Sequence, residues 1–311
     1  MEIMLPFIQE MLMLYILAAV GYAARKIGIL DTSADQVITQ IVLYITLPAL
    51  ILYSMDIPFS AQLAKDMFYL VGLSVCVLLF ACFLGRLLRK RASLAAGRKN
   101  VFEASIIFGN QGFIGFAVSF ILFGRQGIVY ATMFNMVYLI LIWSYGIYLF
   151  VRSKPFTAWR QVFLNPGLLA TGAGLLLFFL PVSWPSPFLN LLENTGKMTI
   201  PLSMLLIGSL LAGIKLEDFF QLIKNRYIWM VTGTRLLLIP LFLLPFVLLS
   251  PPFALFAVAV LVSGMPSAPT VSLYAYKYGG DARFASVAVC VTTICALVTI
   301  PALYFVLRLV Y

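Results

Sequence analysis

Long apolar stretches constrain this chain more than any other feature of its sequence. A helix needs about 20 apolar residues to cross a hydrocarbon core of about 30 Å, and stretches of that length follow one another along the 311 residues. Because 63% of the residues are hydrophobic and only 10% are charged, a soluble domain is excluded. The sequence predicts an all-α polytopic membrane protein with ten transmembrane helices. The expected spans are residues 5–24, 36–55, 67–88, 101–123, 127–151, 166–181, 188–211, 227–249, 253–276 and 284–307.

Short motifs recur in the two halves of the chain at a nearly constant offset. Gly109–Gly112 and Gly264–Ser267 each interrupt an apolar stretch, and their leading glycines are 155 residues apart. Thr46–Pro48 and Thr199–Pro201 recur at an offset of 153 residues. We therefore expect a duplication into two five-helix repeats. Their boundaries are residues 1–152 and 153–311.

The distribution of basic residues predicts that the two repeats are inverted. Because five spans is an odd number, the second repeat must cross the membrane in the sense opposite to the first. The loops after spans 1, 3, 5, 7 and 9 hold sixteen of the 21 basic residues, whereas the other side has Lys65, Arg125 and Arg308. Basic loops face the cytoplasm, so we expect a multi-pass protein of the cell membrane with both termini outside the cytoplasm. The net charge of +10 has the same origin, and no nucleic-acid partner is expected.

The two interruptions predict an interior binding site. An unpaired backbone amide or carbonyl costs several kcal/mol in hydrocarbon, so non-helical backbone persists only beside protein or a water-filled cavity. Inversion brings the two breaks together near the midplane, where transporters built from inverted repeats bind their substrates. The helices that restart at Gln111 and near Ser267 offer N–H groups that favour an anion. The helix ends near Gly109 and Gly264 offer carbonyls that suit a cation or a donor group.

The polar side chains at the breaks suit a small carboxylate substrate. Asn110 and Gln111 carry amides that donate and accept, and Ser267 and Thr270 carry hydroxyls on the opposite break. The alternative is that Gly and Pro only kink two helices, whose polar side chains bond to neighbouring helices. The predicted substrate-binding residues are Asn110, Gln111, Gly112, Met265, Pro266, Ser267, Ala268, Thr270 and Lys197, with helix-break hinges at Gly109, Gly264, Pro48 and Pro201.

Few ionisable residues lie inside the predicted spans, and each is a functional candidate because burying a charge in a membrane is costly. Glu193 and Lys197 are spaced i, i+4, so they either pair on one helix face or present Lys197 to the substrate. Arg235 either snorkels to the cytoplasmic surface or takes part in function. Glu103 is either an interfacial anchor or a proton-coupling group.

The sequence leaves the coupling ion open. The chain has no histidine, the side chain best suited to relaying protons near neutrality. Coupling to protons through Glu103, Glu193 or Arg235 therefore competes with coupling to sodium through carbonyls and amides. The four cysteines lie inside predicted spans, where a thiol is a small apolar filler. We expect no cofactor and no metal site.

Several motifs, in this order and spacing, resemble the auxin efflux carrier family. They are Thr46–Leu50, Gly109–Gly115, Pro201–Gly208 and Met265–Ala268, the last followed by Tyr278 and Gly279. The bacterial members of this family are related to the plant PIN auxin carriers and include carriers assigned to malonate. The family often has a proline where this chain has Ala117 and an asparagine where it has Thr270, differences that bear on the substrate more than on the fold.

The resemblance implies ten helices with crossed, broken helices 4 and 9. It also implies an elevator, in which spans 1, 2, 6 and 7 form a scaffold and spans 3–5 and 8–10 form the moving transport unit. Organic-anion transport is implied, with Asn110 and the Met265–Pro266 segment lining the site. The same scaffold carries different solutes, so the resemblance does not identify the substrate.

Three other functions compete with this interpretation. A sodium-coupled organic-anion symporter, resembling the bile acid sodium symporters, would share the crossed-helix plan. A sensor that does not transport is a second alternative, although such proteins usually carry a soluble output domain. An enzyme is not expected, because no His/Asp/Glu cluster and no nucleophile beside a base appears. The expected partners are a small carboxylate, membrane lipid, and a proton or sodium ion, and a homodimer stays open.

Overall fold

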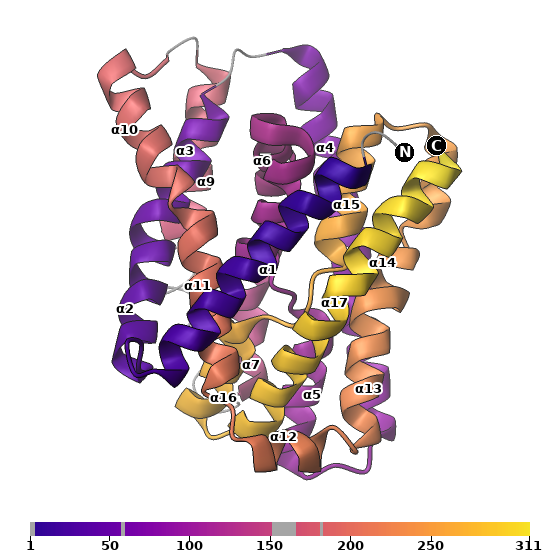
Figure 1. The fold of residues 1–311 in the computed structure, drawn as a ribbon. Helices are drawn as coiled ribbons and strands as arrows, with labels where there is room; N and C mark the ends of the chain where they lie inside the picture. The colour runs from indigo at the N-terminus through magenta and orange to yellow at the C-terminus, as the bar shows by residue number, and fades with distance from the viewer. Residues whose placement is uncertain (1–3, 57–59, 151–165, 181–182) are drawn as a thin grey trace. The chain divides into compact units, whose positions relative to one another are not determined.

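The computed structural model describes residues 4–56, 60–150, 166–180 and 183–311. Within these ranges the regular structure is helical, apart from one antiparallel bridge between Gly109 and Ser267. Figure 1 labels the helices along the chain. The predicted all-helical class is therefore confirmed.

Six segments of the described chain are long and apolar enough to cross a membrane. Large apolar side chains on them are exposed, for example those of Phe68, Phe83 and Val298, as expected for a surface that meets lipid rather than water. The long segments are Thr32–Met55, Ala61–Arg91, Gln111–Phe150, Ser186–Ala212, Arg226–Leu249 and Ala282–Val310, and two shorter apolar helices are Pro166–Phe179 and Phe253–Ser263.

The chain divides into two compact units, which we describe separately. Unit 1 comprises Met1–Tyr69, Gly112–Met136 and Phe163–Gly213. Unit 2 comprises Leu70–Gln111, Val137–Val162 and Ile214–Tyr311.

Small residues allow the helices of unit 1 to pack closely. α1 runs beside α11 (Figure 1), and a Cβ added at Gly21 or Gly208 would overlap a backbone carbonyl of the partner helix. A Cβ at Gly196 would lie 2.7 Å from the Leu50 backbone. Close backbone approach of this kind is how membrane helices associate without a hydrophobic driving force. The helices are α1 (Met4–Lys26), α2 (Thr32–Ile41), η1 (Val42–Thr46), α3 (Leu47–Met55), α9 (Pro166–Phe179), α10 (Ser186–Lys197) and α11 (Thr199–Ala212).

The predicted proline hinges of unit 1 differ from each other. Pro48 follows η1, a π-helical turn, which accommodates the missing N–H of a proline inside a helix. Pro201 lies in the first turn of α11, just after α10 ends at Lys197. In a first turn the missing N–H removes no helical hydrogen bond.

Three helices pass from one unit into the other: α4 (Ala61–Arg91), η2 (Gln111–Gly115) and α6 (Phe116–Leu141). α6 contains one non-helical residue, Gly124, with φ 56° and ψ −139°. A positive φ favours glycine, which has no Cβ to clash with the backbone. This irregularity lies between the spans predicted at 101–123 and 127–151.

Unit 2 is organised around its last helix, α17, which contacts α5, α13, α15 and α16. Asp281 caps α17 by accepting a hydrogen bond from the Phe284 N–H at 2.9 Å, and it pairs with Arg98 at 2.6 Å. The helices are α5 (Ala96–Ile107), η3 (Ile142–Gly146), α7 (Ile147–Phe150), α12 (Leu216–Leu222), α13 (Arg226–Gly233), η4 (Thr234–Leu238), α14 (Ile239–Leu241), η5 (Leu244–Leu249), α15 (Phe253–Ser263), α16 (Pro269–Tyr278) and α17 (Ala282–Val310).

Candidate functional site

The two sequence interruptions meet in unit 2 and pair through their backbones. We call residues 108–111 and 264–268 the crossing. The Asn110 N–H donates to the Pro266 carbonyl at 2.6 Å, and the Ala268 N–H donates to the Phe108 carbonyl at 3.0 Å. Each break thus satisfies backbone groups that the other has freed from its helix, which is the condition for non-helical backbone at membrane depth.

Arg235 binds the helix ends that meet at the crossing. It lies on η4 with a side chain that is 1% exposed. Its Nε donates to the Met265 carbonyl at 2.8 Å, and its Nη1 lies 3.2 Å and 3.4 Å from the carbonyls of Ile107 and Ile106. These carbonyls belong to the last turn of α5 and to the residues just after α15, so one guanidinium holds the ends of both half-helices. The interpretation that Arg235 snorkels to a surface was wrong.

The guanidinium explains why position 109 is glycine. A Cβ at Gly109 would overlap Nη2 of Arg235. The Gly109 carbonyl accepts a hydrogen bond from the Tyr138 hydroxyl at 2.6 Å. Because Gly109 has no side chain, its backbone can lie against the guanidinium of Arg235, while its carbonyl binds the hydroxyl of Tyr138.

Counting helix dipoles gives the crossing a net positive charge. Each helix C-terminal end carries about −0.5 and each N-terminal end about +0.5 elementary charge. The C-terminal ends of α5 and α15 carry about −1 in total, which the positive charge of Arg235 cancels. Arg235 forms no ion pair with any Asp or Glu of the described chain. The N-terminal ends at Gln111 and Pro269 then leave about +1 in total.

Two polar atoms at the crossing lack a hydrogen-bond partner within the described ranges. They are Oε1 of Gln111 and Nη2 of Arg235, and both side chains are 1% exposed. Leaving such atoms unpaired costs about 1–3 kcal/mol each, more for a charged group. A ligand carboxylate accepts from a guanidinium, and a protonated or amide group of a ligand donates to Oε1.

Ser267 is placed differently from the sequence-based expectation. Its hydroxyl donates to the Ser105 carbonyl at 2.8 Å, and its N–H donates to Oγ1 of Thr292 at 3.1 Å. Both donors of Ser267 are therefore engaged within unit 2. The Ser267 hydroxyl joins this break to α5, and the Ser267 backbone N–H joins it to α17.

The other predicted residues of the crossing vary in exposure. Asn110 is 4% exposed, and Met265, Pro266 and Ala268 are buried. Gly264 packs against apolar groups, since a Cβ there would lie 2.9 Å from Leu303. Two further predicted residues, Gly112 and Thr270, are half-exposed.

The predicted site residues are divided between the two units, and Gly112 is the first residue of its segment in unit 1. Lys197 and Glu193 belong to unit 1, where they pair at 2.7 Å. Glu103 belongs to unit 2, and its side chain is fully buried. Its carboxylate binds Arg89 at 2.8 Å and accepts from the Tyr145 hydroxyl at 2.7 Å.

Sequence reasoning missed two polar residues of the site, Tyr138 and Thr292. Each lies inside an apolar span and binds one of the breaks, Tyr138 at Gly109 and Thr292 at Ser267. The signal that was available is a hydrogen-bonding side chain in the middle of a predicted span, because such groups need a partner in hydrocarbon.

Comparison with known proteins agrees with this architecture. The sequence profile of a family described as membrane transport protein matches residues 6–157 and again residues 151–304. The chain belongs to this family, the auxin efflux carriers. An uncharacterized transporter of Methanothermobacter thermautotrophicus is 24% identical over 307 residues, covering 94% of this chain and 96% of its own length. An uncharacterized transporter of Methanocaldococcus jannaschii is 24% identical over 231 residues, covering 71% and 75%.

Membership of the auxin efflux carrier family makes the protein a multi-pass membrane transporter and not an enzyme. The match of one family description to both halves of the chain agrees with the repeat inferred from the offset of 155 residues between Gly109 and Gly264. The crossing is then the meeting point of equivalent segments of the two repeats.

Proposed function

We propose that this transporter carries a small organic anion, a carboxylate, across the cell membrane and binds it at the crossing. Ten spans, arranged as two inverted five-helix repeats with both termini outside the cytoplasm, form the transporter. The odd number of spans per repeat and the basic loops on one side support this topology.

The observation that carries the proposal is the buried Arg235, which has no acidic partner among the residues that the structure describes. Its guanidinium neutralises two helix C-terminal ends and leaves the two N-terminal ends as an excess of about +1. A monoanion, or one carboxylate of a dianion, balances that charge. Nη2 of Arg235 and the amide of Asn110 supply donors for the carboxylate oxygens.

The same guanidinium argues against sodium coupling at this site. The carbonyls at the ends of the half-helices are the groups that a sodium ion would use, and Arg235 already binds those of Met265, Ile107 and Ile106. A sodium ion added there would be repelled by the guanidinium at close range. We therefore expect transport to continue when choline replaces sodium in the medium.

An elevator movement is the proposed transport mechanism, with spans 1, 2, 6 and 7 as scaffold and spans 3–5 and 8–10 as transport unit. Support comes from unit 1, which contains the helices of spans 1, 2, 6 and 7, and from unit 2, which contains those of spans 8–10 and both breaks of the crossing. Residues 112–136 group with unit 1. This grouping departs from the proposed transport unit in the second half of span 4 and the first part of span 5.

A thermal-shift screen on purified protein tests the substrate class. Each carboxylate (malonate, succinate and indole-3-acetate) is compared with its neutral amide at the same concentration and ionic strength. A ligand that binds only the folded state raises apparent stability. At least one carboxylate is expected to raise the melting temperature while its amide does not. Equal shifts with acid and amide would contradict anion recognition.

A further inference from the structure

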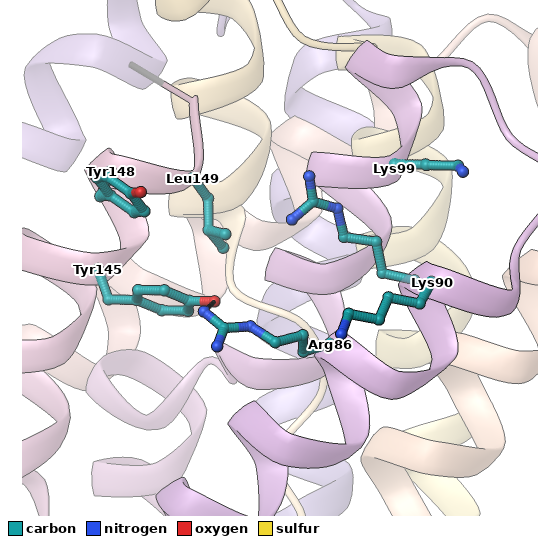
Figure 2. A pocket seen from close by; sticks show the side chains of 7 residues that line it. Arg86, Lys90, Lys99, Tyr145, Tyr148 and Leu149 are labelled. Carbon is teal, nitrogen blue, oxygen red and sulfur yellow. Dashed lines mark hydrogen bonds between the residues drawn. The ribbon is translucent and has the colours of Figure 1, made fainter. Parts of the chain in front are cut away.

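A second site of unit 2 consists of a basic pocket away from the residues of the crossing. The pocket has a volume of about 480 Å³. It is formed by the C-terminal part of α4, by α5 and by the segment η3–α7 (Figure 2). Its lining residues are Arg86, Arg89, Lys90, Lys99, Tyr145, Tyr148 and Leu149.

The pocket has more basic side chains than acidic partners among the described residues. Among the described residues, Arg89 alone of the four cations forms an ion pair, with Glu103 at 2.8 Å. Arg86 reaches the Tyr145 hydroxyl at 3.4 Å, and Figure 2 shows the two side chains tip to tip. Lys90 and Lys99 also line the pocket, and Figure 2 shows the Lys99 ammonium pointing away from Arg86 and Tyr145. Three of the four lining cations therefore have no acid partner among the described residues.

The arrangement costs free energy unless an anion is bound. Arg86 and Lys90 are spaced i, i+4 on α4, and like charges at that spacing destabilise a helix. The side chain of Arg89 is only 20% exposed. An anion held by several of these cations would relieve the repulsion.

The chemistry of the lining favours a phosphate group. Arginine forks bind phosphate through paired hydrogen bonds, and lysines add point charges. A volume of about 480 Å³ is within the range of about 300–1,000 Å³ typical of ligand sites, so it accommodates a headgroup rather than a lone inorganic ion. The apolar part of α4 ends where the cations begin, and Tyr148 is 53% exposed beside them. Tyrosines and basic residues at a helix end mark the membrane interface.

We propose that this pocket binds the phosphate of an anionic lipid headgroup. Basic pockets between membrane helices hold such headgroups through the same contacts. The site is independent of the substrate site, since none of its lining residues belongs to the crossing. It anchors α4, α5 and α7 of unit 2 to a lipid.

Thermal stability of the full-length protein in detergent tests the proposal. The probes are dioleoylphosphatidylglycerol, dioleoylphosphatidylcholine, inorganic phosphate and pyrophosphate. Phosphatidylglycerol is expected to raise the melting temperature by several degrees and phosphatidylcholine to have little effect. Native mass spectrometry should show phosphatidylglycerol retained on the protein. Stabilisation by pyrophosphate or phosphate to the same extent would identify a free phosphate as sufficient.

The matched variants decide whether the effect belongs to the pocket. Lys90→Gln with Lys99→Gln removes two lining cations and should abolish most of the stabilisation and the retained lipid. Lys215→Gln with Lys224→Gln removes two exposed cations of unit 2 that do not line the pocket, and should preserve both. The proposal is overturned if no phosphate probe stabilises the protein, or if both double variants respond equally.

Discussion

The two breaks of the crossing interrupt their helices in the same way, but different side chains surround them. Gly109 lies between the Arg235 guanidinium and the Tyr138 hydroxyl, whereas Gly264, its counterpart at an offset of 155 residues, packs against Leu303 and Pro240. At the same offset, the counterpart of Arg235 is Phe80, which stacks on Phe242 at 4.1 Å. Duplication accounts for the two breaks, and among the described residues the buried cation is present in one repeat and not in the other. A symmetric site would have either no such charge or two.

Replacing the cation should have the largest effect. In Arg235→Gln the hydrogen bonds to the carbonyls of Met265 and Ile107 are lost, and the helix ends keep their negative charge. We expect the free energy of unfolding to fall by about 3–5 kcal/mol. Chemical unfolding in detergent measures it.

The counterpart variant Phe80→Leu provides the control for Arg235→Gln. It removes a ring stack and should cost about 1 kcal/mol. If Arg235→Gln fails to fold, Arg235→Lys keeps the charge and should show an intermediate loss. Equal costs for the Arg235 and Phe80 variants would show that the two repeats do not differ as described.

Replacing the leading glycine of each break by alanine should lower the stability of the protein by different amounts at the two breaks. Gly109→Ala must displace the guanidinium of Arg235, which is held by three carbonyls, and should cost about 3 kcal/mol. Gly264→Ala meets a Leu303 methyl at 2.9 Å, and a flexible side chain moves more easily, so about 1 kcal/mol is expected. Thermal unfolding of the two variants side by side checks the order. A larger cost at Gly264 would contradict it.

Two polar variants should distinguish ligand binding from architecture. Asn110→Ala should weaken binding of the carboxylate found by the screen by about 1–3 kcal/mol, with little change in stability. Ser267→Ala leaves the Ser105 carbonyl without its donor and should lower stability by about 1 kcal/mol, while affinity stays nearly unchanged. Titration of both variants with the same carboxylate measures the first quantity. The assignment is wrong if Ser267→Ala proves to be the variant that loses affinity.

The smallest effects are expected at the residues that bind each break from a neighbouring helix. Tyr138→Phe removes the donor to the Gly109 carbonyl, and Thr292→Val removes the acceptor of the Ser267 N–H. Each should cost about 1 kcal/mol, and the double variant about twice that if the two bonds act independently. Melting temperatures of the single and double variants test this. Strong non-additivity would indicate that the two breaks are one coupled network.

The sequence was sufficient for the features that depend on local chemistry. Glycine lowers helix stability and proline removes a helical hydrogen bond, so the glycine-rich break at Gly109 and the glycine–proline break at Gly264 were visible, as was the all-helical class. The groups that the end of a long side chain contacts depend on tertiary packing, which the sequence alone does not give. Arg235 was therefore assigned to a surface or an unspecified role, although its guanidinium binds the crossing. For the same reason Ser267 was expected to face the substrate, while its hydroxyl donates to Ser105.

The central claim is that Arg235 makes the crossing an anion site, and one titration tests it most directly. Calorimetric titration of wild type and Arg235→Gln with the carboxylate from the screen, and with its neutral amide, gives the preference for acid over amide in each protein. Affinities are compared only for protein that is folded by a separate criterion. The account predicts that this preference falls at least about tenfold in Arg235→Gln, a change of about 1.4 kcal/mol. An unchanged preference for the acid in the folded variant would place anion recognition elsewhere in the molecule.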